Sequence, residues 1–331
     1  MKPTDFSYHL SKFMTDYLAG QRNLSTNTIK SYRDTFILLF GFLNNNHHLP
    51  IEKISIQKIN KPLVEEFLNW LETKRNNSIS TRNQRLAALH SFFRYLQGEK
   101  PEYLFHCQKI ISIPFKRGRK ATIKYLSDKS MKIILSSPDK NTPSGRRDLT
   151  LLSTLYDTGT RVQELADLKV RDVRLETPAI LNIKGKGRKN RHVPILNQTK
   201  NLLIKYLKEQ KLMTTDKLDH PLFFNKQRKK LTRQGVTYIL KKHASEVSLD
   251  NITPHILRHT KAMHLLQAGI NLVYIRDFLG HSELATTEIY ARADTEMKRA
   301  ALEKVKNNVI PKNISNWQEN QDLMDWLNKL C

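Results

Sequence analysis

The sequence has few cysteines, few acidic residues relative to its basic ones, and no long hydrophobic run. Only Cys107 and Cys331 are present among 331 residues, so neither a disulfide framework nor a cysteine metal site is supported. The longest apolar run, Phe36 to Leu43, is far too short to span a bilayer, and Met1 to Leu10 lacks the apolar core of a signal peptide. We therefore expect a cytoplasmic protein with no membrane partner.

The shortage of acidic residues leaves a large positive charge. The chain has 56 Lys and Arg against 31 Asp and Glu, which gives a formal charge of +25 and a pI near 10.0. This excess indicates a polyanionic partner, although solubility alone is a simpler reason for it. Charge therefore raises the question of DNA chemistry without deciding it.

The first hundred residues predict helices, because apolar residues recur three and four positions apart. The expected starts of the second, third and fourth helices are Ser25 or Thr26, Asn60 with Pro62, and Ser80. These patterns predict a compact four-helix module.

A domain boundary is expected where this period is lost, between Gln97 and about Thr122. The segment contains Pro101, Pro114 and the basic run 116–120, which suits a linker lying against something anionic, although a solvated charge run is the commoner explanation. The expected division is a helical domain at 1–116, a basic linker at 117–125, a second domain at 126–300 and a tail at 301–331.

The second domain mixes helices with two short strands. Ser127 is expected to cap a short helix, and the strands 179–184 and 190–195 are joined by a glycine-bearing hairpin turn. Further helices are expected near 147–157, 198–211, 232–245, 253–268 and 271–279, and through Tyr290. The predicted fold class is mainly α with a small antiparallel β-sheet in the second domain.

His255 and Arg258 form the first pair of candidate site residues. Thr253 and Pro254 are suited to begin a helix, and the two candidates then lie on one face of its first turn, where a phosphate is favoured. Taken alone, such a pair more often has a surface or core role.

Two further candidates are cationic. Arg161 follows the helix-ending Gly159, and Glu164, one turn on, can hold a guanidinium or a neighbouring histidine, although an ordinary surface pair is the plainer explanation. Lys186 lies at the tip of the basic hairpin 184–191, where a lysine can approach a phosphate or a leaving oxygen closely, although nonspecific phosphate contact is also possible.

The last candidates are His281, after the helix-capping Gly280, and Tyr290. A tyrosine in an apolar-periodic helix is usually a core residue. As a set, however, two arginines, two histidines, a lysine and a tyrosine suffice for transesterification at a phosphodiester without metal. The sequence shows neither a His-Glu-x-x-His motif nor an acidic triad that would compete for this role.

Four ordered motifs resemble the tyrosine recombinase (phage integrase) family, and most of all its Xer-type members. The motifs are Gly159–Leu165, Gly185–Gly187, Pro254–Thr260, and Leu279–Ser282 ahead of Tyr290, and the resemblance also reaches residues 28–32 and 80–86 of the first domain. It implies a two-domain clamp on DNA, with a helical core-binding domain and a tyrosine recombinase catalytic fold.

The resemblance also implies residue roles. Arg161 and Arg258 would bind the non-bridging oxygens of the scissile phosphate, and His281 would donate a further hydrogen bond. Lys186 would protonate the leaving 5′ oxygen, while His255 would assist phosphate binding and accept the proton of the nucleophile. Tyr290 would form a 3′-phosphotyrosyl bond, with no cofactor and no metal.

The expected partners are duplex DNA with an inverted-repeat core site and other protomers of the same chain. Two protomers are expected at each site and four in the paired synapse, alone or with a sister recombinase. The expected location is the nucleoid. The predicted DNA-binding residues are Lys116, Arg117, Arg119, Lys120, Lys184, Arg188, Lys189, Arg191, Arg82 and Arg85. The cellular role stays open between integration, transposition and Xer-type resolution. Two alternative functions also stay open: a type IB topoisomerase-like enzyme and a non-catalytic DNA-binding protein of the same fold. The tail could dock in cis or in trans.

Overall fold

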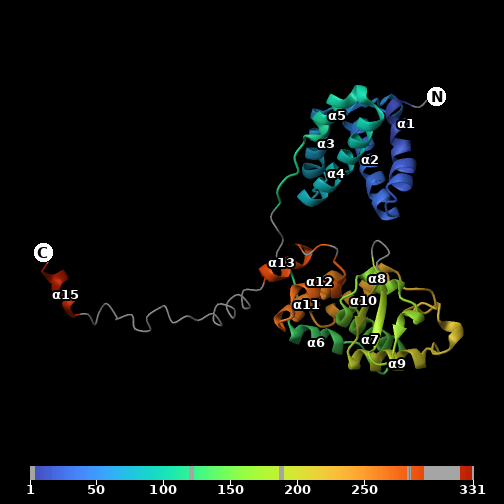
Figure 1. Ribbon diagram of the computed structural model, residues 1–331, viewed down its shortest axis with the longest axis vertical. Coiled ribbons are helices and arrows are strands. Elements are labelled where there is room, and N and C mark those ends of the chain that lie inside the picture. The colour runs from blue at the N-terminus through green and yellow to red at the C-terminus, as the bar shows by residue number, and fades with distance from the viewer. Residues whose placement is uncertain are drawn as a thin grey trace. The chain divides into compact units, whose positions relative to one another are not determined.

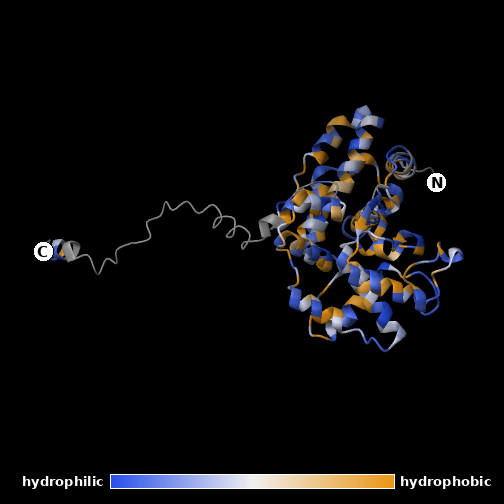
Figure 2. Ribbon diagram, turned by 60° about the horizontal axis from the view of Figure 1, so that its bottom comes forward, coloured by the Kyte–Doolittle hydropathy of each residue, from blue (hydrophilic) through white to orange (hydrophobic). Residues whose placement is uncertain are grey.

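The computed structural model describes residues 4–118, 123–185, 190–281, 283, 285–293 and 321–329. The chain divides into two units, Met1–Ala121 and Thr122–Cys331 (Figure 1). Most helices in both units combine hydrophobic and hydrophilic residues (Figure 2), as expected for helices that pack on one side. Within the described residues, every helix is too short or too polar to cross a bilayer.

The first unit is helical throughout its described elements. Its helices are α1 (Asp5–Lys12), a π-helix (Phe13–Gln21), α2 (Thr26–His47), α3 (Lys61–Thr73), α4 (Ile79–Glu99) and α5 (Leu104–Ile111), with short 3-10 turns at Ile51–Lys53, Ile56–Lys58 and Pro101–Tyr103. Phe92 of α4 lies at the centre of its core. The ring of Phe92 makes edge-on contacts with Phe6, Phe13 and Phe36, at centroid distances of 5.2, 5.3 and 5.4 Å. These contacts join three helical segments to α4.

Helix starts in this unit follow side-chain caps. Ser25 and Asn60 accept hydrogen bonds from the backbone of the first turns of α2 and α3, as predicted. The predicted start of α4 at Ser80 is wrong, because the Oγ of Ser78 accepts the hydrogen bond from the backbone N–H of Thr81 (3.2 Å).

The expected loss of helix after Gln97 is also wrong. Helix α4 continues to Glu99, and α5 follows, with Cys107 and Ile110 buried in the core. Pro101 begins the turn that leads into α5 rather than ending all helical structure, because a proline is tolerated in the first turn of a helix.

The second unit contains helices and a small sheet. Its elements are α6 (Asp128–Ser136), α7 (Pro143–Thr158), α8 (Val162–Asp167), β1 (Val173–Arg174), β2 (Ile180–Lys184), β3 (Asn190–Pro194), α9 (Asn197–Glu209), α10 (Arg233–Ser245), α11 (Pro254–Gln267), α12 (Leu272–Leu279), α13 (Ala285–Ala293) and α15 (Gln321–Asn328), with 3-10 turns at Val170–Asp172 and Thr215–Lys217. The three described strands form an antiparallel sheet in the order β1-β2-β3. The predicted fold class is therefore confirmed, and β1 is an addition too short to show any alternation of residue types.

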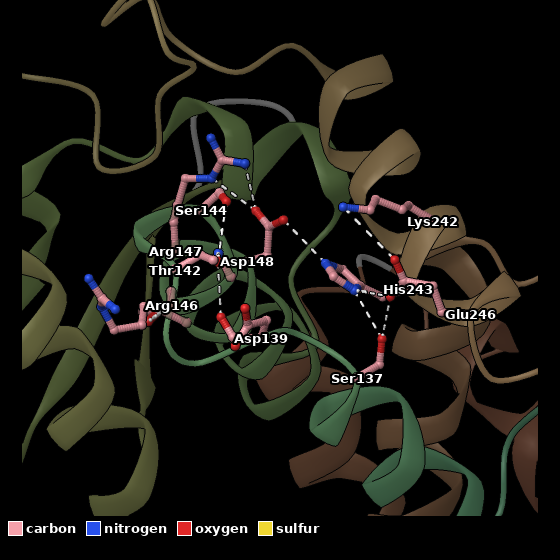
Figure 3. A network of polar contacts seen from close by, with 12 residues as sticks. Ser137, Asp139, Thr142, Ser144, Arg146, Arg147, Asp148, Lys242, His243 and Glu246 are labelled. Carbon is pink, nitrogen blue, oxygen red and sulfur yellow. Dashed lines mark hydrogen bonds and ion pairs between the residues drawn. The ribbon is translucent and has the colours of Figure 1, made fainter.

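A buried polar network joins α6, α7 and α10 (Figure 3). The Nε2 of His243 lies 3.2 Å from Asp148 Oδ2, and its Nδ1 lies 2.8 Å from Glu246 Oε2 and 3.0 Å from Ser137 Oγ. Arg147 donates to the other carboxylate oxygen of Asp148 at 2.7 Å. Asp148 and His243 are buried, so loss of the bond between them would leave a buried polar group without its partner, and these contacts therefore fix α10 against α7.

Helices α11, α12 and α13 lie together in Figure 1. They share a small hydrophobic cluster that contains Met263, Leu266, Ile275, Leu279 and Tyr290. The sequence motifs at 254–260 and 279–281 are therefore held by packed helices rather than by long loops.

Candidate active site

Two glycines end helices α7 and α12 at the centre of the candidate site. Gly159 and Gly280 have φ values of +55° and +68°, a conformation that favours glycine. A Cβ at Gly159 would lie 2.9 Å from Leu279 Cδ2, and one at Gly280 would lie 2.8 Å from Arg191 Nη1. A side chain at either position would force Leu279 or the guanidinium of Arg191 to shift and would hold the backbone in a conformation that favours glycine.

Arg258 joins these two helix ends. Its Nη1 donates to the carbonyl of Gly159 (2.6 Å) and its Nη2 to the carbonyl of Leu279 (2.7 Å). The residue is 2% exposed, and burial together with the charge of Arg161 lowers the pKa of its guanidinium to about 10. A guanidinium carries five N–H donors, so hydrogens remain for an anion.

Glu164 holds two guanidinium groups. Its carboxylate accepts from the backbone N–H of Arg161 (2.9 Å), from Arg161 Nη1 (2.8 Å) and from Arg191 Nη2 (2.7 Å). Arg161 Nη2 also donates to the carbonyl of Gly280 (3.2 Å), while its side chain stays 40% exposed. Arg161 is therefore fixed in place with donors still open to solvent.

The Glu164→Gln variant is expected to lose about 2 kcal/mol of stability at neutral pH, because two charged hydrogen-bond partners lose their carboxylate. Burial raises the pKa of Glu164, but the bonds from Arg191 and Arg161 outweigh it, so the net pKa lies below 4.5. A lowered folded pKa contributes stability above the unfolded pKa, and this contribution is lost as pH falls from about 4.5 through the folded pKa. Denaturant unfolding at a series of pH values measures it.

The difference between wild type and Glu164→Gln should shrink as pH falls below about 4.5. A difference that stays constant across this range would contradict the assignment. Glu176→Gln is the matched control, since that side chain is 74% exposed and should change stability little at any pH.

Tyr290 lies against His281 in the buried interior of the site. Their rings are nearly parallel, with an interplanar angle of 13° and centroids 6.5 Å apart. The Nδ1 of His281 is bonded to Thr287 Oγ1 of α13 (2.9 Å), which leaves Nε2 available to a ligand. Tyr290 itself is 1% exposed.

The phenol of Tyr290 is bonded to a histidine of α11. Its Oη lies 2.8 Å from Nδ1 of His259, not from His255, the residue that the sequence predicted as its proton acceptor. His255 is exposed, and its ring contacts that of His259 at a centroid distance of 4.2 Å.

The described candidates share one electrostatic environment. Burial raises the pKa of Tyr290 to about 12, and the charges of Arg258 and Arg161 oppose that rise. Burial and the same two arginines lower the pKa of His281 to about 4 and also lower that of His255. An anion placed among these groups would face two fixed positive charges and the phenol at once.

The sequence of both units matches known protein families. Residues 124–297 match the model of the phage integrase family, and residues 12–100 match the phage integrase N-terminal SAM-like domain. The chain belongs to the phage integrase family. It is a tyrosine recombinase.

Individual relatives cover most of this recombinase. A protein of Sinorhizobium fredii named as an integrase/recombinase, y4rC, is 37% identical over 97% of each chain. Tyrosine recombinase XerC of Roseiflexus castenholzii is 35% identical over 85% of this chain and 87% of its own. The structure of XerH bound to a palindromic difH substrate aligns with a TM-score of 0.68, at 22% identity over 88% of this chain and 84% of that one, which shows a shared fold.

The remaining predicted site residues of the recombinase fall into three groups. Lys186 and the predicted DNA-binding residues Arg119, Lys120, Arg188 and Lys189 lie outside the described residues. Exposed side chains are found at Lys116, Arg117 and Lys184, and Lys116 also pairs with Glu72 (2.8 Å).

Three arginines predicted as DNA-binding have partners inside the recombinase. Arg82 is 5% exposed and donates to the carbonyl of Pro114 (3.2 Å), and Arg85 donates to the carbonyl of Ser31 (3.0 Å). The Arg191 side chain is 12% exposed and pairs with Glu164. These contacts support structural roles for the three guanidinium groups, and their contact with DNA stays a prediction.

His259 and Thr287 were missed by the sequence reasoning. A histidine one helical turn beyond His255 lies on the same helix face, and this spacing was the signal that could have indicated His259. Thr287 had no such signal, since its bond to His281 depends on how α13 packs.

Proposed function

We propose that this recombinase cuts and rejoins DNA strands at a specific site through a 3′-phosphotyrosyl bond to Tyr290. The observation that carries the proposal is the position of the buried Tyr290 phenol, stacked on His281 and subject to the charges of Arg161 and Arg258. A tyrosine that served the core alone would not require two fixed guanidinium groups whose charges act on its hydroxyl.

In the proposed reaction the scissile phosphate binds where these groups meet. Donors of Arg161 and Arg258 neutralise its non-bridging oxygens, and Nε2 of His281 adds a hydrogen bond. Lys186 protonates the 5′ oxygen that leaves as Tyr290 attacks phosphorus. The phosphotyrosyl bond conserves the energy of the broken link, so rejoining needs neither ATP nor a cofactor.

The resting position of Tyr290 makes cleavage depend on DNA binding. At 1% exposure the phenol is shielded from solvent, so the site must open for a substrate phosphate to reach it. We therefore propose that a free protomer does not cleave DNA, because the nucleophile is withheld until the site is occupied.

The proposed substrate is duplex DNA with an inverted-repeat core site, bound by two protomers and paired in a tetramer, with or without a sister recombinase. The net charge of +25 supports strongly salt-dependent DNA binding. The proposed location is the cytoplasm, on the nucleoid. The likeness to y4rC and to XerC supports integration, transposition or Xer-type resolution as the cellular role.

Helix α15 is proposed to mediate contacts between protomers. Trp326 and Leu327 are 58% and 46% exposed on this short helix. Replacing both with alanine is expected to abolish cooperative binding to a two-site DNA, while binding to a single half-site stays unchanged, as measured by gel shift. The Asn328→Ala, Lys329→Ala pair is the matched control. Unchanged cooperativity in the first variant would assign the helix to packing within its own chain.

Strand exchange between paired sites tests the function. DNA protected by the protein around the ends of its own gene supplies the site, and a plasmid that carries two copies is the substrate. Recombinant products are expected. Relaxation of supercoils without exchange would indicate a topoisomerase-like enzyme, and binding without any covalent adduct would indicate a protein that has lost catalysis.

A further inference from the structure

His259 makes a contact that the proposed function does not use. It follows Arg258 directly on α11, and its Nδ1 lies 2.8 Å from the Oη of Tyr290. This oxygen is the atom that would attack phosphorus. A group bonded to the attacking oxygen is in the position that a general base requires, about 2.6–3.2 Å from the atom that carries the proton.

The ring of His259 is held between two other aromatic groups. It meets the ring of His255 at 4.2 Å between centroids and 69° between planes, and that of Tyr290 at 5.5 Å and 63°. These edge-on contacts from both sides fix the orientation of the imidazole.

The protonation state of His259 also suits an acceptor. Burial lowers the pKa of His259 to about 4, with further contributions from His255 and Arg258, so the ring is neutral at physiological pH. A neutral imidazole with its hydrogen on Nε2 offers a lone pair at Nδ1, and the Tyr290 hydroxyl donates to it.

We infer that His259 takes the phenolic proton of Tyr290 during strand cleavage and returns it during rejoining. The inference rests on the proposed function. In cleavage the Oη–H bond breaks as the Nδ1–H bond forms, the Oη–P bond forms, and the P–O5′ bond breaks with a proton from Lys186 passing to O5′. Rejoining reverses each step.

The same contact accounts for a silent resting site. With the pKa of Tyr290 raised to about 12 and that of His259 lowered to about 4, the proton stays on the phenol while no phosphate is bound. A phosphodiester beside Arg258 offsets one of the positive charges that lowers the pKa of His259. Transfer of the proton is therefore expected only together with formation of the Oη–P bond, when the substrate is present.

His255 is left with a different task. It is exposed on the first turn of α11, while the phenol is bonded to His259, so His255 is placed to meet the phosphate and to support the ring of His259.

Single-turnover cleavage of a nicked suicide substrate by the full chain tests this assignment. His259→Phe keeps an aromatic ring in the contact and removes the acceptor nitrogen, so we expect folding and DNA binding close to wild type and cleavage slower by about 10²–10⁴-fold. Installing 3-fluorotyrosine in place of Tyr290 makes the phenol more acidic and should restore at least about tenfold of that loss, because a weaker base then suffices.

A second substrate separates the proton acceptor from the proton donor. A 5′-phosphorothiolate at the scissile position gives a leaving thiolate that needs no proton, so it should relieve the defect of Lys186→Ala and leave that of His259→Phe in place. His255→Ala is the comparison variant, and 3-fluorotyrosine should restore less of its lost rate than of that of His259→Phe.

The inference would be overturned if a folded His259→Phe variant cleaved within about threefold of wild type, or if the phosphorothiolate relieved its defect. It would also be overturned if 3-fluorotyrosine did not speed cleavage by His259→Phe, or if it restored the rate of His255→Ala and not that of His259→Phe. Failure of the proposed function is distinct, because the wild-type protein would then form no covalent adduct with its own site.

Discussion

Replacing Arg258 with alanine is expected to slow strand cleavage by about a thousandfold or more. Removing one preorganised donor from a developing oxyanion typically costs about 10²–10³ in rate, and Arg258 supplies a buried full charge as well as donors. The variant also deprives the carbonyls of Gly159 and Leu279 of their donor, which should lower stability by about 1–3 kcal/mol. Single-turnover cleavage and denaturant unfolding measure the two effects separately.

A neutral substrate distinguishes charge neutralisation from structural damage by Arg258→Ala. A methylphosphonate at the scissile position carries no negative charge, so the variant should recover most of the lost rate on it. If the variant is equally slow on phosphate and on methylphosphonate, Arg258 acts by holding the helix ends and not by binding the phosphate.

The Tyr290→Phe variant is expected to form no covalent adduct at all, since it lacks the attacking oxygen. The phenyl ring keeps the contact with His281, and only the bond to His259 is lost, so stability should fall by about 1 kcal/mol and DNA binding should persist. Denaturing gels of the protein with labelled suicide DNA detect the adduct.

Tyr274→Phe is the matched control for this loss. Tyr274 lies on α12 in the same unit and is 72% exposed, so its variant should form the adduct at the wild-type rate. An adduct in Tyr290→Phe would assign the nucleophile to another residue.

Much of the local structure was predictable because its signals lie within a few residues. Ser25, Asn60 and Ser127 cap helices through bonds to their own first turns, and Gly159 and Gly280 end helices in a conformation that favours glycine. The β2–β3 hairpin likewise follows from alternation and a glycine-bearing turn.

The remaining features depend on tertiary contacts that no local pattern records. Helix α5 is stabilised by burial of Cys107 and Ile110 against the rest of its unit. Arg82 and Arg191 are basic residues of the kind that bind DNA. Only the fold shows that Arg82 donates to the carbonyl of Pro114 and Arg191 to the carboxylate of Glu164. The choice between two histidines as partner of the nucleophile was equally hidden, because both share a helix face.

The central claim is that the phenol of Tyr290 becomes joined to the 3′ end of the cut strand. Protease and nuclease digestion of the adduct trapped on a suicide substrate, followed by mass spectrometry, locates the joined residue directly. The account predicts a nucleotide linked through its 3′ phosphate to the peptide that contains Tyr290. A nucleotide on any other residue, or one linked through a 5′ phosphate, would contradict it.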